Sequence, residues 1–101
     1  MIRIEKGVDI CNLSPQMAVA VAVLQSAFRE TLSAALTITS GRDGNHRHVL
    51  HYVGQALDFR IHNLTTSDMD RVEGLCQGLL GEQYDVVLEN DHLHVEFDPR
   101  Q

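Results

Sequence analysis

Two short segments alternate strictly between apolar and ionisable residues, and this alternation constrains the fold more than any other feature of the sequence. The segments are Ala56–Ile61, which reads ALDFRI, and His92–Phe97, which reads HLHVEF. Because side chains alternate faces along a strand, each segment predicts a β-strand with one apolar face for the core. The opposite face gathers Ala56, Asp58 and Arg60 from the first strand and His92, His94 and Glu96 from the second.

Capping residues mark the starts of two predicted helices. Ser14 followed by proline predicts a helix start, because serine caps the free N–H groups and proline suits the first helical position. The apolar stripe of this helix extends to about Leu32. Either Thr65 or Thr66 caps a second helix, whose end is predicted at Gly81.

Further strands complete the predicted fold. They are expected around Ile2 and Ile4, over 36–40 and over Tyr84–Glu89, from which a tight turn at 89–91 leads into His92–Phe97 as a hairpin. This order of elements predicts an α+β fold, with helices packed on one face of a small, mostly antiparallel sheet. The length of 101 residues suits a single domain spanning 1–101.

The charge balance argues against nucleic acid as a partner. The chain has 8 Lys and Arg against 14 Asp and Glu, a net charge of −6, and lacks the basic stripe of nucleic-acid binders. The N-terminus lacks the apolar segment of a signal peptide, and the apolar run at 17–24 is too short to span a membrane. We therefore expect a protein that is cytoplasmic when made and has no membrane partner. No pattern fixes the oligomeric state, and a monomer is expected.

The two cysteines are not spaced as zinc ligands. Cys11 and Cys76 form no Cys-x-x-Cys pair, and both have apolar neighbours. We expect both to be small buried side chains, and nothing in the sequence supports a disulfide between them.

Three side chains are candidate metal ligands. If the two alternating strands are neighbours, Asp58 and His94 face the same cleft. His51 lies seven positions before Asp58, an odd separation that would put them on opposite faces of a continuous strand. A turn at Gly54 would bring His51 back, because glycine adopts positive φ at little cost. Two imidazoles, one carboxylate and an open position would suit a catalytic zinc.

Ordinary polar chemistry is the competing explanation for this pattern. A single histidine usually has no special role, and His-x-His often arises by chance, so the spacing alone leaves both interpretations open. The remaining histidines are expected to lie in loops or on the surface; they are His46, His48 and His62.

A resemblance to a known enzyme family is carried by two segments, SGRDGNHRHVLHYVGQALDFR and ENDHLHVEFDP. Together they resemble the zinc D-alanyl-D-alanine carboxypeptidase family. That family also includes vancomycin-resistance D-Ala-D-Ala dipeptidases, phage L-alanyl-D-glutamate endolysins and, by fold, the hedgehog signalling domain. The shared pattern is a His, six residues, an Asp and a later His-x-His, with Gly-x-Ala-x-Asp around the first carboxylate. The matching residues are His51, Gly54, Ala56, Asp58, His92 and His94.

The resemblance implies a hedgehog/DD-peptidase-like fold in which Zn²⁺ is held by His51, Asp58 and His94. Family members carry an acidic general base three positions before the last ligand, and that position is Asp91 here. Glu89 is a rival, because the hedgehog-like arrangement puts a glutamate slightly further upstream.

Two more residues receive roles from the resemblance. His92 would stabilise the oxyanion or orient the ligands. Arg42, in the Ser-Gly-Arg segment, resembles the family's arginine near the metal and would hold a substrate carboxylate or the oxyanion. The alternative for Arg42 is an exposed loop arginine.

The function implied by the resemblance is a zinc metallopeptidase acting on bacterial peptidoglycan. Its substrate would be the stem peptide, cut as by a D-Ala-D-Ala carboxypeptidase or an L-Ala-D-Glu endopeptidase. The short chain is similar to phage-encoded members, which reach the cell wall after release by lysis. The alternative is a zinc-binding recognition module without catalysis, as in hedgehog domains, and the acidic candidates Asp91 and Glu89 favour the enzyme.

Overall fold

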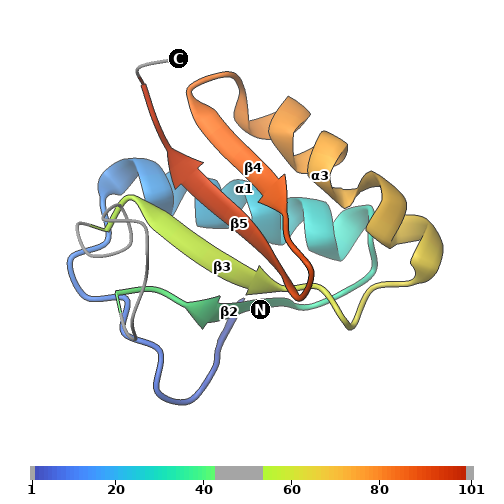
Figure 1. Cartoon of the computed structure of the whole chain (residues 1–101), viewed down its shortest axis with the longest axis horizontal. Helices are drawn as coiled ribbons and strands as arrows, with labels where there is room; N and C mark the ends of the chain where they lie inside the picture. The colour runs from blue at the N-terminus through green and yellow to red at the C-terminus, as the bar shows by residue number, and fades with distance from the viewer. Residues whose placement is uncertain (1, 43–53, 100–101) are drawn as a thin grey trace.

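The computed structural model describes residues 2–42 and 54–99, which form an α+β fold. The elements run in the order β1 (Ile2–Ile4), α1 (Pro15–Glu30), β2 (Leu36–Ser40), β3 (Ala56–Arg60), α3 (Thr66–Leu80), β4 (Tyr84–Leu88) and β5 (His92–Phe97). Figure 1 shows α1 crossing behind the sheet and α3 lying alongside β4. The predicted α+β class is therefore confirmed.

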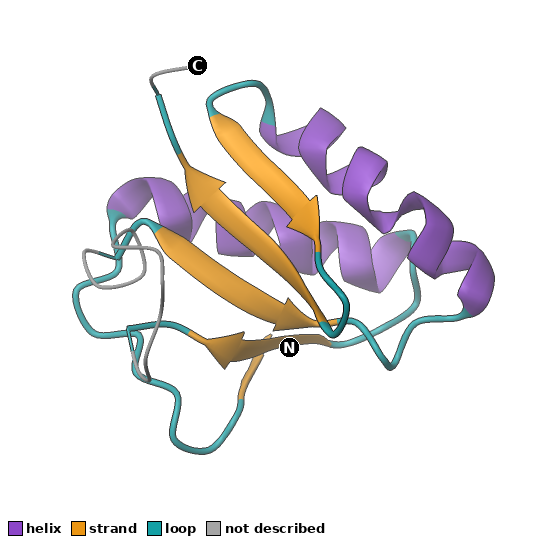
Figure 2. Ribbon diagram, in the orientation of Figure 1, coloured by secondary structure: helices purple, strands orange, loops and turns teal. Residues whose placement is uncertain are grey.

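The sheet of the described residues has the order β1-β2-β3-β5-β4. β1 pairs with β2 in parallel, and every other neighbouring pair is antiparallel. The strands that are last in the chain thus lie at one side of the sheet, and β3 and β5 are neighbours near its middle (Figure 2). Because β3 and β5 are neighbours, the polar side chains of the two alternating segments lie on one shared face of the sheet.

One apolar core lies between the helices and a single face of the sheet. It combines the inward side chains of α1 and α3 with those of the strands. The strand residues in this core include Leu57, Phe59, Leu93 and Val95, as the alternation predicts. Complete burial of a side chain of this size contributes roughly 1.5–3 kcal/mol, so the core fixes which face of β3 and β5 points inward.

The start of α1 is tied to the chain just before β3. Ser14 caps the helix as predicted, accepting a hydrogen bond from the Met17 N–H at 3.1 Å. The Ser14 hydroxyl also donates to the side chain of Gln55 at 2.8 Å, and its N–H donates to the Gly54 carbonyl at 3.0 Å. These bonds hold the entry to β3 against the first helix.

Side chains of α3 satisfy the outer backbone of β4. Gln77 accepts from the Val86 N–H at 3.0 Å and donates to the Tyr84 carbonyl at 2.7 Å. Glu73 accepts from the Leu88 N–H at 2.6 Å. These three backbone groups, which another strand could otherwise pair with, are therefore bonded within the chain.

The element boundaries differ slightly from the predicted ones. α1 ends at Glu30 rather than near Leu32, although Leu32 is still buried against the core in the turn that follows. Thr65 rather than Thr66 caps α3, accepting from the Asp68 N–H, and Gly81 ends that helix as predicted. Within residues 2–42 and 54–99, no helix combines the length and apolarity that crossing a membrane requires.

The prediction that both cysteines are buried is wrong for Cys11. Cys76 lies in the core, where burial raises the pKa of its thiol to about 12 and keeps it protonated at neutral pH. Cys11 is exposed in the loop before α1, and both thiols are free. Apolar neighbours in the sequence did not identify the loop, because burial depends on where the chain turns.

Gly54 is a position at which we expect the backbone to tolerate no side chain. Its φ is +77°, and a Cβ there would lie 1.9 Å from the carbonyl oxygen of Asn12. Gly54→Ala is expected to lower the free energy of unfolding by at least about 2 kcal/mol, because strain and overlap add. Chemical denaturation measures this change.

Gly74→Ala is the matched control. Gly74 lies within α3, and no atom lies within 4 Å of the place that a Cβ would occupy. Alanine there is therefore expected to stabilise the protein by about 0.5–1 kcal/mol. Equal effects of the two substitutions would contradict the strain assigned to Gly54.

Candidate functional site

Asp58 and His94 lie directly opposite each other on β3 and β5. The Nδ1 atom of His94 is 2.9 Å from Oδ1 of Asp58, and both side chains are almost completely buried. The predicted shared face of the two strands is therefore confirmed. The contact joins residues 36 positions apart in the chain, so it exists only in the folded sheet.

Glu96 holds the other side of the same imidazole. Its Oε1 atom is 2.8 Å from Nε2 of His94, and its side chain is only 9% exposed. Because ionised carboxylates only accept hydrogen bonds, His94 donates from both ring nitrogens and is an imidazolium in this arrangement. The sequence interpretation gave Glu96 no role, although its spacing of two residues from His94 places both side chains on one face.

The pKa of His94 is raised above its ordinary value of 6.5. Burial by itself lowers this pKa, but the hydrogen bonds to Asp58 and Glu96 and their negative charges outweigh the burial. Two buried carboxylates thus hold one positive charge between them.

A second histidine links the turn before β5 to Asp58. The Nδ1 atom of His92 is 2.6 Å from Oδ1 of Asp91, and its Nε2 is 3.6 Å from Oδ1 of Asp58. The first distance is a short hydrogen bond, and the second is an ion-pair distance that is too long for one. Asp91, His92 and Asp58 therefore form a row that leads from the exposed turn to the buried His94.

Asp58, Asp91 and His92 border a hollow of about 370 Å³. Its described lining consists of Glu5, Thr39, Ser40, Asp58, Arg60, His62, Asp91 and His92. Arg60 brings a fixed positive charge to the hollow and is ion-paired with Glu5. The Nε atom of Arg60 is buried without a hydrogen-bond partner in the described part of the chain.

An irregularity in β2 shapes the wall of the hollow beside Asp58. Ile38 pairs with Phe59 and Ser40 pairs with Asp58, so the register shifts within two residues of β2. Such bulges bend a strand and redirect its side chains, often next to functional sites. Here the shift sets Ser40 opposite Asp58 at the edge of the site.

Not every predicted site residue lies in this cluster. Arg42 and Glu89 are exposed, and neither is among the described residues that line the hollow. The Arg42 N–H donates to the Asp9 carbonyl at 2.6 Å, and the Glu89 N–H donates to the His92 carbonyl at 2.9 Å. His62 is exposed, as predicted.

Three predicted histidines fall outside the described residues. They are His51, the expected third metal ligand, and the loop histidines His46 and His48. The predicted turn nearby is supported by Gly54, whose φ is positive.

The described residues fit part of a zinc site. Among residues 2–42 and 54–99, no group of three or more His, Cys, Asp or Glu side chains could hold a metal ion. Asp58 and His94 nevertheless supply a carboxylate and an imidazole in direct contact, which are two of the three donors expected for a catalytic zinc. The carboxylates that compensate an imidazolium would also compensate a metal cation, so the donor chemistry is compatible with zinc.

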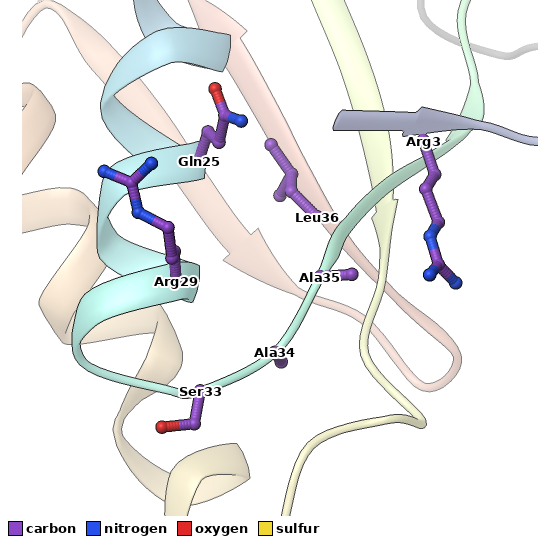
Figure 3. A pocket seen from close by; sticks show the side chains of 7 residues that line it. All are labelled: Arg3, Gln25, Arg29, Ser33, Ala34, Ala35 and Leu36. Carbon is purple, nitrogen blue, oxygen red and sulfur yellow. The ribbon is translucent and has the colours of Figure 1, made fainter. Parts of the chain in front are cut away.

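A second hollow, of about 340 Å³, lies where α1 leads into β2. Arg3 and Arg29 line it, but their guanidinium groups lie on either side of the segment 33–36 and do not converge (Figure 3). Arg29 is also paired with Glu30 at 3.2 Å. Its described lining contains no histidine, cysteine or carboxylate, whereas the hollow beside Asp58 is lined by all but the cysteine.

No protein-family model matches the chain, and no curated protein shows significant similarity to it.

The raised pKa of His94 predicts that the metal-free protein loses stability as the pH rises. A raised folded pKa contributes stability that is complete below about pH 6.5 and is lost as the pH rises through the folded value. Urea unfolding in the presence of a chelator, from about pH 6 to 9, measures the expected fall. The decrease in the free energy of unfolding with pH should become smaller in His94→Gln and should persist in the exposed control His62→Gln. An equal fall in His94→Gln would contradict the assignment.

Proposed function

We propose that this protein is a zinc-dependent peptidase that cleaves the stem peptide of bacterial peptidoglycan, with a hedgehog/DD-peptidase-like fold. The observation that carries the proposal is the direct pairing of the buried His94 with Asp58, which lines one hollow together with Asp91 and His92. The resemblance of the two sequence segments to the zinc carboxypeptidase family supports the same assignment. The bond cut would be D-Ala-D-Ala or L-Ala-D-Glu.

The proposed metal ligands are His51, Asp58 and His94. When bound, zinc would polarise the scissile carbonyl and lower the pKa of a water molecule. Asp58 and His94 are held by the pairing of β3 with β5, so the sheet fixes the spacing of these two donors. Rigid strands position such groups better than loops do.

Asp91 is the proposed general base. It would accept a proton from the attacking water and later deliver it to the leaving amine. The hydrogen bond from His92 directs the Asp91 carboxylate over the hollow, whereas Glu89 is not among the described residues that line it. The geometry therefore favours Asp91 over Glu89, and His92 would orient the base and stabilise the oxyanion.

Two arginines are candidates to hold a substrate carboxylate. Arg42 is proposed from the resemblance, and Arg60 because its charge lines the same hollow as Asp58. A guanidinium group can hold a carboxylate through two parallel hydrogen bonds, which suits this role.

The metal site predicts a specific loss of zinc in three variants. The protein as purified is expected to contain about one zinc per chain, measured by elemental mass spectrometry. His51→Ala, Asp58→Ala and His94→Ala should each weaken zinc binding by more than the roughly 10- to 100-fold typical of outer-shell partners. His62→Ala, which removes an exposed histidine, is expected to keep the metal. Equal zinc content in all four variants would contradict the ligand assignment.

The base assignment predicts that Asp91→Asn retains zinc and loses catalysis. The release of muropeptides from purified cell wall should fall by about 10²- to 10⁴-fold, the usual contribution of a general base. Glu89→Gln is the matched control and is expected to stay active. A loss confined to Glu89→Gln would transfer the role to that residue.

The same assay separates the enzyme from a recognition module. Zinc binding without muropeptide release by the wild-type protein would favour a non-catalytic module of the same fold. Absence of both zinc binding and cleavage would contradict the proposed function as a whole.

A further inference from the structure

The imidazole of His94 is clamped between two carboxylates that approach it from different sides. Asp58 faces Nδ1 at 2.9 Å and Glu96 faces Nε2 at 2.8 Å. All three side chains are buried, so solvent does not compete strongly for these contacts. A ring held at both nitrogens has a fixed orientation.

The two carboxylates differ in their access to the hollow. Asp58 is among its lining residues, together with Asp91 and His92, whereas Glu96 is not among the described residues that line it. His94 is not among the described lining residues either, but its Nδ1 side contacts Asp58, the carboxylate that borders the hollow. The Nε2 side faces the interior contact with Glu96.

The side chains across from Glu96 offer it no competing donor. Its direct neighbours on the adjacent strands are Ala56 on β3 and Asp85 on β4. A methyl group cannot donate a hydrogen bond, and an ionised carboxylate only accepts. Among its cross-strand and ring neighbours, the His94 N–H is therefore the donor that Glu96 uses.

We propose that Glu96 is a positioning residue that accepts the Nε2–H of His94 and so selects the ring form whose Nδ1 binds the metal beside Asp58. This inference rests on the proposed zinc site. Metal-bound histidines commonly donate their second N–H to a carboxylate, which fixes the ring orientation and strengthens the ligand. Glu96 acts through His94 and does not touch the substrate.

The direct test is the position of the proton on His94 in the zinc-loaded protein. Long-range ¹H–¹⁵N correlation spectra distinguish a protonated ring nitrogen from a metal-bound one. We expect the proton on Nε2 and the metal on Nδ1. The opposite assignment, with Nε2 on the metal, would overturn the proposal.

Variants of Glu96 test the same idea through zinc affinity, measured by competition with a chelator. Glu96→Ala is expected to weaken zinc binding by about 10- to 100-fold. Glu96→Gln should weaken zinc binding less, because the glutamine amide oxygen still accepts the Nε2–H of His94. Glu82→Ala removes the same charge from an exposed loop and should leave the affinity unchanged. If Glu96→Ala fails to fold, Glu96→Gln and its spectrum decide the outcome.

These measurements distinguish an error in the role of Glu96 from an error in the proposed zinc site. If the wild-type protein binds zinc and the Glu96 variants bind it as tightly as Glu82→Ala does, only the role of Glu96 is wrong. If the wild-type protein binds no zinc, the metal site itself is wrong, and the role of Glu96 falls with it.

Discussion

The contact between Asp58 and His94 depends on the register of β3 against β5, and the rest of the site depends on that register. Because side chains alternate faces, a slip of one residue would turn His94 toward the helices and Leu93 or Val95 toward the polar side. The core opposes such a slip, since it would expose fully buried apolar side chains. The packing that stabilises the sheet therefore also sets the geometry of the ionisable cluster on its other face.

Charge balance is the second constraint on this cluster. Asp58 and Glu96 are both nearly buried, and a buried carboxylate without a partner is strongly destabilising. The imidazolium of His94 compensates both of them in the metal-free protein, which explains its raised pKa. A cation is thus part of what makes this arrangement stable, and the proposed metal would satisfy the same electrostatic requirement.

The sequence predicted the elements and the shared face of β3 and β5 because these follow from local periodicity and capping. Asp58 and His94 were paired correctly, since a period of two assigns a face without knowledge of the turns. The contact of Glu96 with His94 was missed because a carboxylate on a polar face looks like an ordinary solvated residue until its burial is known. The bulge opposite Asp58, the exposure of Cys11 and the entry of Arg60 into the hollow depend on long-range packing, which no local pattern records. His51 was predicted as a ligand and lies outside the described residues.

The sheet has two unlike borders. On the β4 side, Gln77 and Glu73 bond the outward N–H groups of Val86 and Leu88 and the carbonyl of Tyr84. A peptide or a neighbouring molecule that added itself as an extra strand there would first have to displace both side chains of α3. Strand addition at this border of the sheet is therefore opposed by the second helix itself, whose side chains stand in for the missing neighbour.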